Sequence, residues 1–141
     1  MKKYTQADFD NFEVDEYGRK ICPAGDYTAI KSFGERCSFG ERCSFGAVCR
    51  FGEGCSFGEE CSYENGAVKN GRYVAVDRIG HENRKAYFFA DESGNMFVRA
   101  GCWFSDMEAF KERVKKVHAG TIHEKTYLAA CDLAELMLKG E

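Results

Sequence analysis

The strongest constraint on this chain is a six-residue phrase that occurs five times in a row between residues 33 and 62. The copies read FGERCS, FGERCS, FGAVCR, FGEGCS and FGEECS. Each copy fixes a phenylalanine, a glycine directly after it and a cysteine three positions after the glycine, and it leaves the two residues between the glycine and the cysteine free. Such a period excludes a helix, whose apolar rows recur about every 3.6 residues, and it excludes heptads. It predicts one strand and one corner per copy, as in a parallel β-helix.

The residue types suit that geometry. An inward phenylalanine would fill the middle of a flat face, and a small cysteine would suit the tight inner position near the corner. Glycine would accept the backbone angles of the bend that follows. The aromatic positions are Phe33, Phe39, Phe45, Phe51 and Phe57, and the cysteine positions are Cys37, Cys43, Cys49, Cys55 and Cys61.

The phrase resembles the hexapeptide repeat of left-handed parallel β-helices. In that family three hexapeptides form one triangular coil, so the resemblance implies that residues eighteen apart stack at about the 4.8 Å spacing of neighbouring strands. The implied pairs are Phe33 with Phe51, Phe39 with Phe57, Cys37 with Cys55 and Cys43 with Cys61. Tyr27 and Tyr63 extend the aromatic position, whereas Lys31 stands where a cysteine should be. We therefore expect a short helix of about two to three coils.

The rest of the chain predicts an α+β fold. Ahead of the repeat, Thr5 has the character of a helix cap, and residues 1–26 are expected to cover the open end of the β-helix. Behind it, runs at 72–79, 85–90 and 95–104 predict an antiparallel three-strand meander. Two C-terminal helices follow, with capping boxes predicted at 105–108 and 121–124.

These segments divide the chain into three parts: an N-terminal cap at 1–26, the hexapeptide β-helix at 27–68, and the meander with two helices at 69–141. A β-helix of this length cannot bury a sufficient core alone, so we expect the last part to form one compact unit with it. The final helix carries more apolar residues than a narrow stripe needs, which favours deep burial over a partial interface.

Composition limits the partners and the location. The 141-residue chain has a formal charge of −3, so it offers no net basic field, and direct nucleic-acid binding is not expected. No apolar run reaches membrane length, and the first residues lack a signal-peptide pattern. The sequence therefore predicts a cytoplasmic protein without a membrane partner.

The eight cysteines favour buried thiols over disulfides or a metal site. Five of them follow the repeat, which explains them as packing residues. Their C-x₅-C spacing does not match the C-x₂₋₄-C pairs of zinc sites. Oxidation of Cys37 with Cys55 stays open in the stacked arrangement. We expect no metal and no cofactor.

No motif supports catalysis. His81, His118 and His123 are expected on a loop and at helix ends, where His118 or His123 could reach Cys102 or Cys131. A nucleophilic Cys102 with His123 as its base lacks any neighbouring signature. Hexapeptide-repeat acyltransferases are the alternative that the resemblance offers. They typically have more coils and a catalytic histidine, and residues 27–68 contain none. A γ-type carbonic anhydrase is excluded by the same count, so no catalytic residue is predicted.

Binding is the function that the repeat favours. Outward residues one coil apart would form ordered charge rows that dock on a basic or mixed protein surface or imitate nucleic-acid phosphates. The candidate binding residues are Glu35, Arg36, Glu41, Arg42, Glu53, Glu59 and Glu60. A further alternative is a sponge for a small nucleotide signal, in a pocket between subunits or between the repeat and the meander. Its candidate anion contacts are Arg72, Arg78, Arg84 and Arg99.

The overall layout resembles small uncharacterised proteins of phages and prophages. The segment FEVDEYGRKICPAGDYTAI precedes the F-G-x-x-C-x repeats, and AGCWFSDMEAFKERVKKVHAGTIHEKTYLAACDLAEL follows them. The resemblance implies an accessory protein that binds and inhibits a host protein or effector complex in the host cytoplasm, for example an anti-CRISPR or another anti-defence factor. The identity of the partner and the formation of homo-oligomers stay open.

Overall fold

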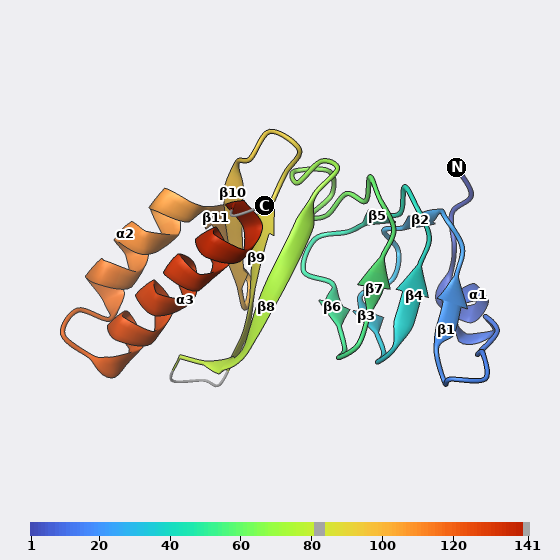
Figure 1. Ribbon diagram of the computed structural model, residues 1–141, viewed down its shortest axis with the longest axis horizontal. Coiled ribbons are helices and arrows are strands. Elements are labelled where there is room, and N and C mark those ends of the chain that lie inside the picture. Colours follow the sequence, from blue (N-terminus) through green and yellow to red (C-terminus); the bar gives the residue numbers. More distant parts are fainter. Residues whose placement is uncertain (81–83, 140–141) are drawn as a thin grey trace. The chain divides into compact units, whose positions relative to one another are not determined.

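The computed structural model describes residues 1–80 and 84–139. The chain forms two compact units, which divide between Gly71 and Arg72. The first unit holds the repeat, and the second holds an antiparallel sheet with two helices (Figure 1). The protein is therefore α+β, with parallel and antiparallel sheets in separate units. No helix among the described residues is both long enough and apolar enough to cross a membrane.

The first unit begins with one short helix and continues as short strands. Its elements are α1 (Gln6–Asp10), β1 (Lys20–Cys22), β2 (Asp26–Tyr27), β3 (Ser32–Phe33), β4 (Cys37–Phe39), β5 (Ser44–Phe45), β6 (Arg50–Phe51) and β7 (Ser56–Phe57). The strands pair in parallel as three small sheets, β1-β4-β7, β2-β5 and β3-β6 (Figure 1). Strands consecutive in sequence thus belong to different sheets, which a corner after each strand allows.

The pairing register is eighteen residues in all three sheets of the repeat. Phe39 pairs with Phe57, and Phe33 pairs with Phe51. Their rings stack, with centroids 5.2 Å apart for the first pair and 5.1 Å apart for the second. The predicted stacking of these two pairs is confirmed. We call each set of three consecutive hexapeptides a rung.

Rings from the three sheets also meet each other inside the unit. The Phe45 ring lies edge-on to Phe39 at 4.9 Å and edge-on to Phe51 at 5.0 Å. Tyr27 and Tyr63 stack on the two faces of Phe45, at 5.8 and 5.5 Å. Edge-to-face and offset-stacked arrangements of rings are both favourable, so the rings of this interior make favourable contacts on several sides.

The N-terminal segment covers one end of this aromatic interior. Thr5 and Asp8 form the capping box of α1, as the side chain of each residue accepts a hydrogen bond from the other's backbone N–H. The cap predicted at Thr5 is confirmed. Tyr4 stacks on Tyr27 at 5.1 Å, and Phe9 lies edge-on to Phe33 at 5.3 Å. Both covering rings are buried.

Parallel pairing starts earlier than the repeat itself. In β1 the register is seventeen residues, so that Cys22 lies opposite Phe39. The register returns to eighteen at β2, because the corner at residues 23–25 is one residue shorter than the corner at 40–43. Cys22 is buried and takes the place that phenylalanine takes on the rungs above.

The reason predicted for the repeat glycines is wrong. The left-handed backbone angles of the corners belong to the second residue after glycine, as in Arg42 with a φ of 58°. Glycine is needed instead because the neighbouring rung approaches closely. A Cβ at Gly58 would lie 2.6 Å from the backbone nitrogen of Glu41, whereas a Cβ at Gly34 would meet nothing within 4 Å. The two positions look identical in sequence, yet only Gly58 has a rung beneath it.

The second unit contains a four-stranded antiparallel sheet and two helices. Its elements are β8 (Arg72–Ile79), β9 (Arg84–Ala90), β10 (Met96–Ala100), β11 (Trp103–Asp106), α2 (Met107–Val117) and α3 (Ile122–Lys139). The strand order is β11-β10-β9-β8. The predicted three-strand meander is therefore wrong, because its third run divides at Gly101. A φ of 60° at this glycine allows the turn that pairs Ala100 with Trp103.

Neither C-terminal helix starts with the predicted capping box. The N-cap of α2 is Asp106, which accepts the backbone N–H of Ala109 at 2.8 Å, while Ser105 belongs to β11. Before α3, the Thr121 hydroxyl donates to the carbonyl of His118 at 2.8 Å instead of accepting from the helix. The sequence located both helix starts closely but assigned the wrong side chains to them.

Helices α2 and α3 pack on one face of the sheet (Figure 1). The core between them is apolar and includes Phe88, Val98, Phe110, Val114, Tyr127, Cys131, Ala134 and Leu138. The predicted deep burial of α3 holds for one face only. Leu133, Leu136 and Met137 are 51%, 73% and 49% exposed on the other face.

Candidate binding surfaces

The predicted binding residues lie at two corners of the first unit, and all of them are exposed. One corner comprises residues 34–36 and, on the next rung, 52–54. The other comprises residues 40–42 and 58–60. Backbone hydrogen bonds join each corner to the rung above, from the N–H of Arg36 to the carbonyl of Glu53 at 2.8 Å and from Arg42 to Glu59 at 2.9 Å. We call these side chains the corner rows.

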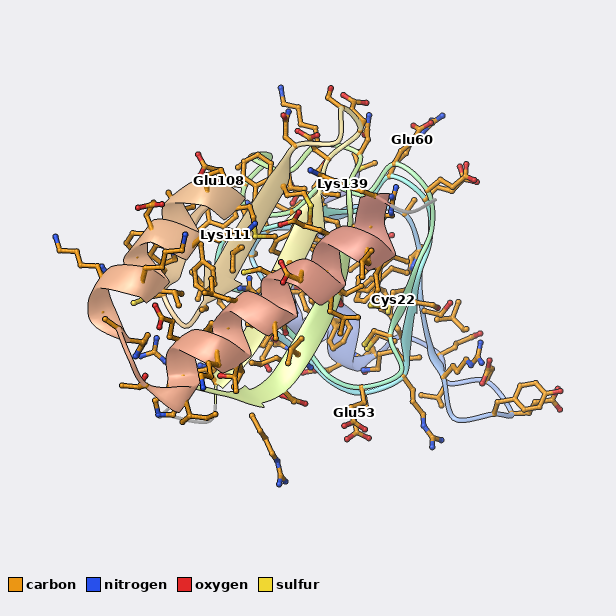
Figure 2. The ribbon with its side chains drawn as sticks, turned by 60° about the vertical axis from the view of Figure 1, so that its left-hand side comes forward. Cys22, Glu53, Glu60, Glu108, Lys111 and Lys139 are labelled. Carbon is orange, nitrogen blue, oxygen red and sulfur yellow. The ribbon has the colours of Figure 1, made fainter. Side chains whose placement is uncertain are left out.

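One charge pair within the corner rows links two rungs directly. The Arg42 Nε lies 3.2 Å from the Glu60 Oε2, and both side chains are more than half exposed. An exposed pair of this kind contributes only about 0 to 1 kcal/mol to stability. Figure 2 shows Glu53 and Glu60 projecting outward from the ribbon. The corner rows thus contribute little to the stability of the unit and expose their charges to solvent.

The corner rows are negative on balance. The corner residues 34–36, 40–42, 52–54 and 58–60 hold five carboxylates and two guanidinium groups. The first unit as a whole, residues 1–71, has twelve acidic and nine basic side chains. The negative charge of the protein therefore belongs to the unit that carries the repeat.

The repeat cysteines are thiols held inside the corners. No disulfide joins the eight cysteines, all of which are among the described residues. The Cys43 sulfur lies 3.2 Å from the carbonyl oxygen of Gly40, and Cys61 repeats this contact with Gly58 at 3.3 Å. The thiol therefore donates to the carbonyl of the glycine three residues earlier. This contact accounts for cysteine at the position, because cysteine is small, largely apolar and a weak hydrogen-bond donor. Cys37, Cys43, Cys49 and Cys61 are buried as predicted, whereas Cys55 is half-buried.

Two of the buried thiols, Cys37 and Cys43, are poor nucleophiles. A hydrogen bond to Cys22 raises the pKa of Cys37 to about 11. The contact with Cys61, together with burial, raises the pKa of Cys43 as well. Both groups are protonated at neutral pH, and a thiol reacts as its thiolate. Among the described residues, no group of three or more histidine, cysteine or acidic side chains could hold a metal ion.

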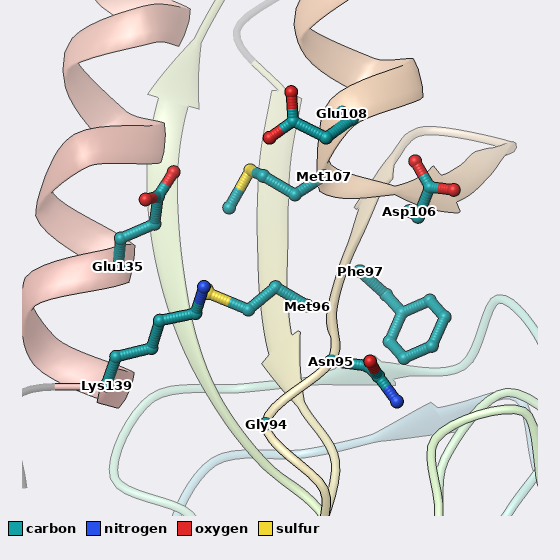
Figure 3. A pocket seen from close by; sticks show the side chains of 9 residues that line it. All are labelled: Gly94, Asn95, Met96, Phe97, Asp106, Met107, Glu108, Glu135 and Lys139. Atoms are coloured by element: carbon teal, nitrogen blue, oxygen red, sulfur yellow. The ribbon is translucent and has the colours of Figure 1, made fainter.

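A cavity of about 440 Å³ in the second unit lies where α2 starts and α3 ends. Figure 3 shows that Glu108 comes from α2, whereas Glu135 and Lys139 come from α3. Its carboxylates face Lys111, whose Nζ lies 2.6 Å from Glu135 and 3.9 Å from Glu108. The hydrogen bond to Glu135 raises the pKa of Lys111. This ion pair joins the two helices, so we assign the cavity a structural role.

The histidines and cysteines considered for catalysis are divided between two pockets and the core. Cys102 is exposed and lines a pocket with His118, whereas His123 lines a different pocket beside β8. Cys131 lies in the core, where burial raises its pKa to about 12. The structure therefore places Cys102 beside His118 in one pocket and His123 in the lining of another. His81, the third histidine, lies outside the described residues.

The four arginines considered as anion contacts are also separated. Arg72 donates to the carbonyl of Leu138, and the Arg99 guanidinium lies 4.1 Å from the centre of the Tyr87 ring. Arg78 lines the pocket beside β8. Arg84 lines the Cys102 pocket, where it is joined by Arg113, which sequence reasoning missed. No motif in the sequence marked Arg113, because only tertiary packing brings it to the same pocket as Arg84.

Comparison with protein families, curated proteins and solved structures finds no match for this chain. Its function is therefore argued from the surfaces and pockets described above.

Proposed function

We propose that the protein is a non-enzymatic binding protein that docks its corner rows on a basic surface of a partner protein. The observation that carries this proposal is the repetition of exposed carboxylates one rung apart, as in Glu35 with Glu53 and Glu41 with Glu59, on a backbone whose corners are hydrogen-bonded to each other. A preorganised row loses little conformational entropy on binding. Ordered charge also accelerates encounter with a complementary surface.

The negative charge of the corner rows suits imitation of nucleic-acid phosphates. Neighbouring parallel strands lie about 4.8 Å apart. Phosphates along one strand of DNA rise by about 3.4 Å each. The two spacings differ, so the proposed imitation depends on a regular row of negative charges and not on a matched distance. A basic groove that accommodates a nucleic-acid backbone is the partner surface of complementary charge. This inference concerns the partner protein, not nucleic acid itself, which the negative rows would repel.

We further propose that the three small sheets close into a short left-handed β-helix. The supporting observations are the eighteen-residue register in each sheet and the meeting of rings from all three sheets in one interior. The hand is inferred from the resemblance to hexapeptide repeats. It opposes the right-handed preference of most parallel crossovers, so a crystal structure with a right-handed winding would contradict it.

The resemblance to small phage proteins directs the choice of partner. We propose a host protein or effector complex of bacterial defence in the host cytoplasm, with inhibition as the consequence of docking. A nucleic-acid-guided complex fits the corner rows because its guide and target channels are basic. An anti-CRISPR role is the most specific form of this proposal.

The proposal is tested by neutralising the corner rows without changing their size. A variant with Glu35→Gln, Glu41→Gln, Glu53→Gln and Glu59→Gln avoids the left-handed positions and keeps the backbone hydrogen bonds. A matched control removes four exposed carboxylates elsewhere, by Glu13→Gln, Asp77→Asn, Glu112→Gln and Asp132→Asn.

Both variants and the native protein would be used to capture partners from a bacterial lysate, followed by affinity measurements with the purified partner over a salt series. We expect the corner variant to bind at least about tenfold more weakly and with a smaller salt dependence. The control should bind as the native protein does. Equal binding by both variants would refute the role of the corner rows, and a partner with an acidic contact surface would refute the phosphate imitation.

A further inference from the structure

The pocket that contains Cys102 differs chemically from the other cavities of the second unit. Its volume is about 310 Å³. This value lies at the lower end of the roughly 300 to 1,000 Å³ found for small-molecule sites. Its lining comes from β9, β10, β11, both helices and the connection between α2 and α3. The described lining residues are Arg84, Ala100, Cys102, Trp103, Phe110, Arg113, Val114, Val117, His118 and Tyr127.

Two guanidinium groups and one histidine enter this pocket from separate elements of the fold. Arg84 comes from β9, Arg113 from α2 and His118 from the C-terminal cap of α2. No carboxylate occurs among the described residues that line it. The cavity at the start of α2 and the pocket beside β8 both include acidic side chains among their described lining residues. Guanidinium groups that converge from different elements are a common means of holding a phosphate or carboxylate.

The turn between β10 and β11 is shaped around Arg84. A Cβ at Gly101 would lie 2.9 Å from the Arg84 Nη1, so the guanidinium lies directly against the backbone of this glycine. Gly101 also has a left-handed φ of 60°. A larger residue there would meet both backbone strain and the arginine. The glycine therefore helps to keep Arg84 at the pocket.

Aromatic rings form the remaining walls. The Arg113 guanidinium lies 4.3 Å from the centre of the Trp103 ring, which is a cation–π contact. The His118 ring stacks on Tyr127 at 5.6 Å, and Phe110 lies edge-on to Tyr127 at 5.5 Å. The Trp103 indole N–H donates to the Ser105 hydroxyl at 2.9 Å, which fixes the orientation of the indole. Such walls offer stacking surfaces for a planar ring.

We propose that this pocket binds a nucleoside phosphate, with the arginines contacting the phosphate and the aromatic walls contacting the base. The site lies entirely within residues 84–127 of the second unit, so it is independent of the corner rows. It differs from the nucleotide pocket considered from the sequence, because only Arg84 of the four arginines named there contributes to it.

Trp103 provides a direct measurement, because it is the only tryptophan of the chain and it lines the pocket. The full-length protein would be titrated with AMP, GMP, CMP and UMP, with excitation near the red edge of indole absorption and calorimetry in parallel. Adenosine and inorganic phosphate serve as probes that carry only one half of the proposed ligand. We expect at least one nucleotide to change the fluorescence saturably and to bind at least about tenfold more tightly than either half.

Variants of the two arginines test whether the nucleotide binds in this pocket. Arg84→Met and Arg113→Met keep side-chain length and should each weaken nucleotide binding at least about tenfold, as expected for loss of a charge-assisted contact. Lys115→Met is the matched control, since this exposed lysine of α2 lies outside the described lining. Circular dichroism and the urea midpoint of each variant show whether it is folded.

The proposal is overturned if none of the four nucleotides binds saturably. It is also overturned if inorganic phosphate binds as tightly as the nucleotides, or if both arginine variants retain native affinity while folded. Retained binding by Lys115→Met together with loss in either arginine variant supports the site. Loss of partner-protein binding in the corner-row variant would not change nucleotide binding by the pocket. The two proposals can therefore be refuted separately.

Discussion

The two units of this protein build their interiors in opposite ways. In the first unit an aromatic ring recurs at the same inner position, so Phe45 has phenylalanine rings beside it and tyrosine rings stacked on its two faces. In the second unit the core combines different residue types from strands and helices, as in Phe88 with Phe110. The difference teaches that a short sequence period can specify packing directly, whereas a mixed core depends on which elements meet.

The largest expected effect comes from removing one ring from each interior. Phe45→Ala and Phe88→Ala each truncate a phenylalanine that is at most 1% exposed. Each change should destabilise its own unit by about 3 to 5 kcal/mol, the usual cost of such truncations. Urea unfolding would be followed by far-ultraviolet circular dichroism and by Trp103 fluorescence, which reports on the second unit.

The two variants are each other's control. Phe45→Ala should move the dichroism transition and leave the Trp103 transition near its native midpoint, and Phe88→Ala should move the Trp103 transition. If Phe45→Ala shifted the fluorescence midpoint as far as Phe88→Ala does, the two interiors would not be separate cooperative cores.

A smaller effect should distinguish two glycines that the sequence presents as equivalent. Gly58→Ala places a Cβ 2.6 Å from the backbone of the rung beneath, and Gly34→Ala places it in open space. Overpacking of this kind costs about 1 to 3 kcal/mol. Gly58→Ala should therefore lower the urea midpoint of the first unit, and Gly34→Ala should leave it nearly unchanged. Equal midpoints for the two variants would contradict the close approach of successive rungs.

The contrast between the two interiors also explains how much of the fold could be predicted from the sequence. The stacking of Phe39 on Phe57 was predictable, because it depends only on the local period and on three strands per rung. The need for glycine at position 58 was not, since it arises from a backbone eighteen residues away. The short corner that places Cys22 opposite Phe39 also escaped prediction, because it breaks the period just before the repeat begins.

The second unit was predicted in outline only. Runs of β-branched and aromatic residues located the strands, but the turn at Gly101 divides what reads as one continuous run. The exposed face of α3 could not be separated from its buried face by composition. Of the candidate site residues, the exposure of the corner rows followed from the repeat. Arg113 joins Arg84 only through tertiary packing, so its role at the pocket carried no sequence signal.

A smaller, pH-dependent effect is expected at Asp26, beside the end of the aromatic interior. Its carboxylate accepts hydrogen bonds from the Thr28 hydroxyl at 2.6 Å and from the Thr28 backbone N–H at 2.9 Å, and these bonds lower its pKa from the ordinary value of an aspartate. A carboxylate with a lowered pKa contributes stability above its unfolded value, and this contribution is lost as the pH falls through the folded value. The first unit should therefore unfold at lower urea at pH 3 than at pH 6.

Thr28→Val tests this assignment, because it removes the hydroxyl donor and keeps the side-chain shape. The difference between the midpoints at pH 6 and pH 3 should shrink in the variant. The two proteins should approach each other at low pH, where Asp26 is protonated in both. An unchanged pH dependence in Thr28→Val would contradict the assignment.

The smallest effect concerns reactivity and involves no change in stability. In native protein a thiol reagent should modify Cys102 rapidly and the half-buried Cys55 more slowly. The six buried thiols should react only after unfolding, since they are shielded from the reagent. Peptide mapping after timed labelling measures this order. Rapid native labelling of Cys43 or Cys61 would contradict the enclosed corners of the first unit.

The most direct test of the account is a nuclear Overhauser measurement between phenylalanine rings of the first unit, with residue assignments made in isotopically labelled protein. The account predicts ring contacts at a separation of eighteen residues, between Phe33 and Phe51 and between Phe39 and Phe57, whose centroids lie 5.1 and 5.2 Å apart. The absence of both contacts in folded protein, or stacking at another separation, would contradict it.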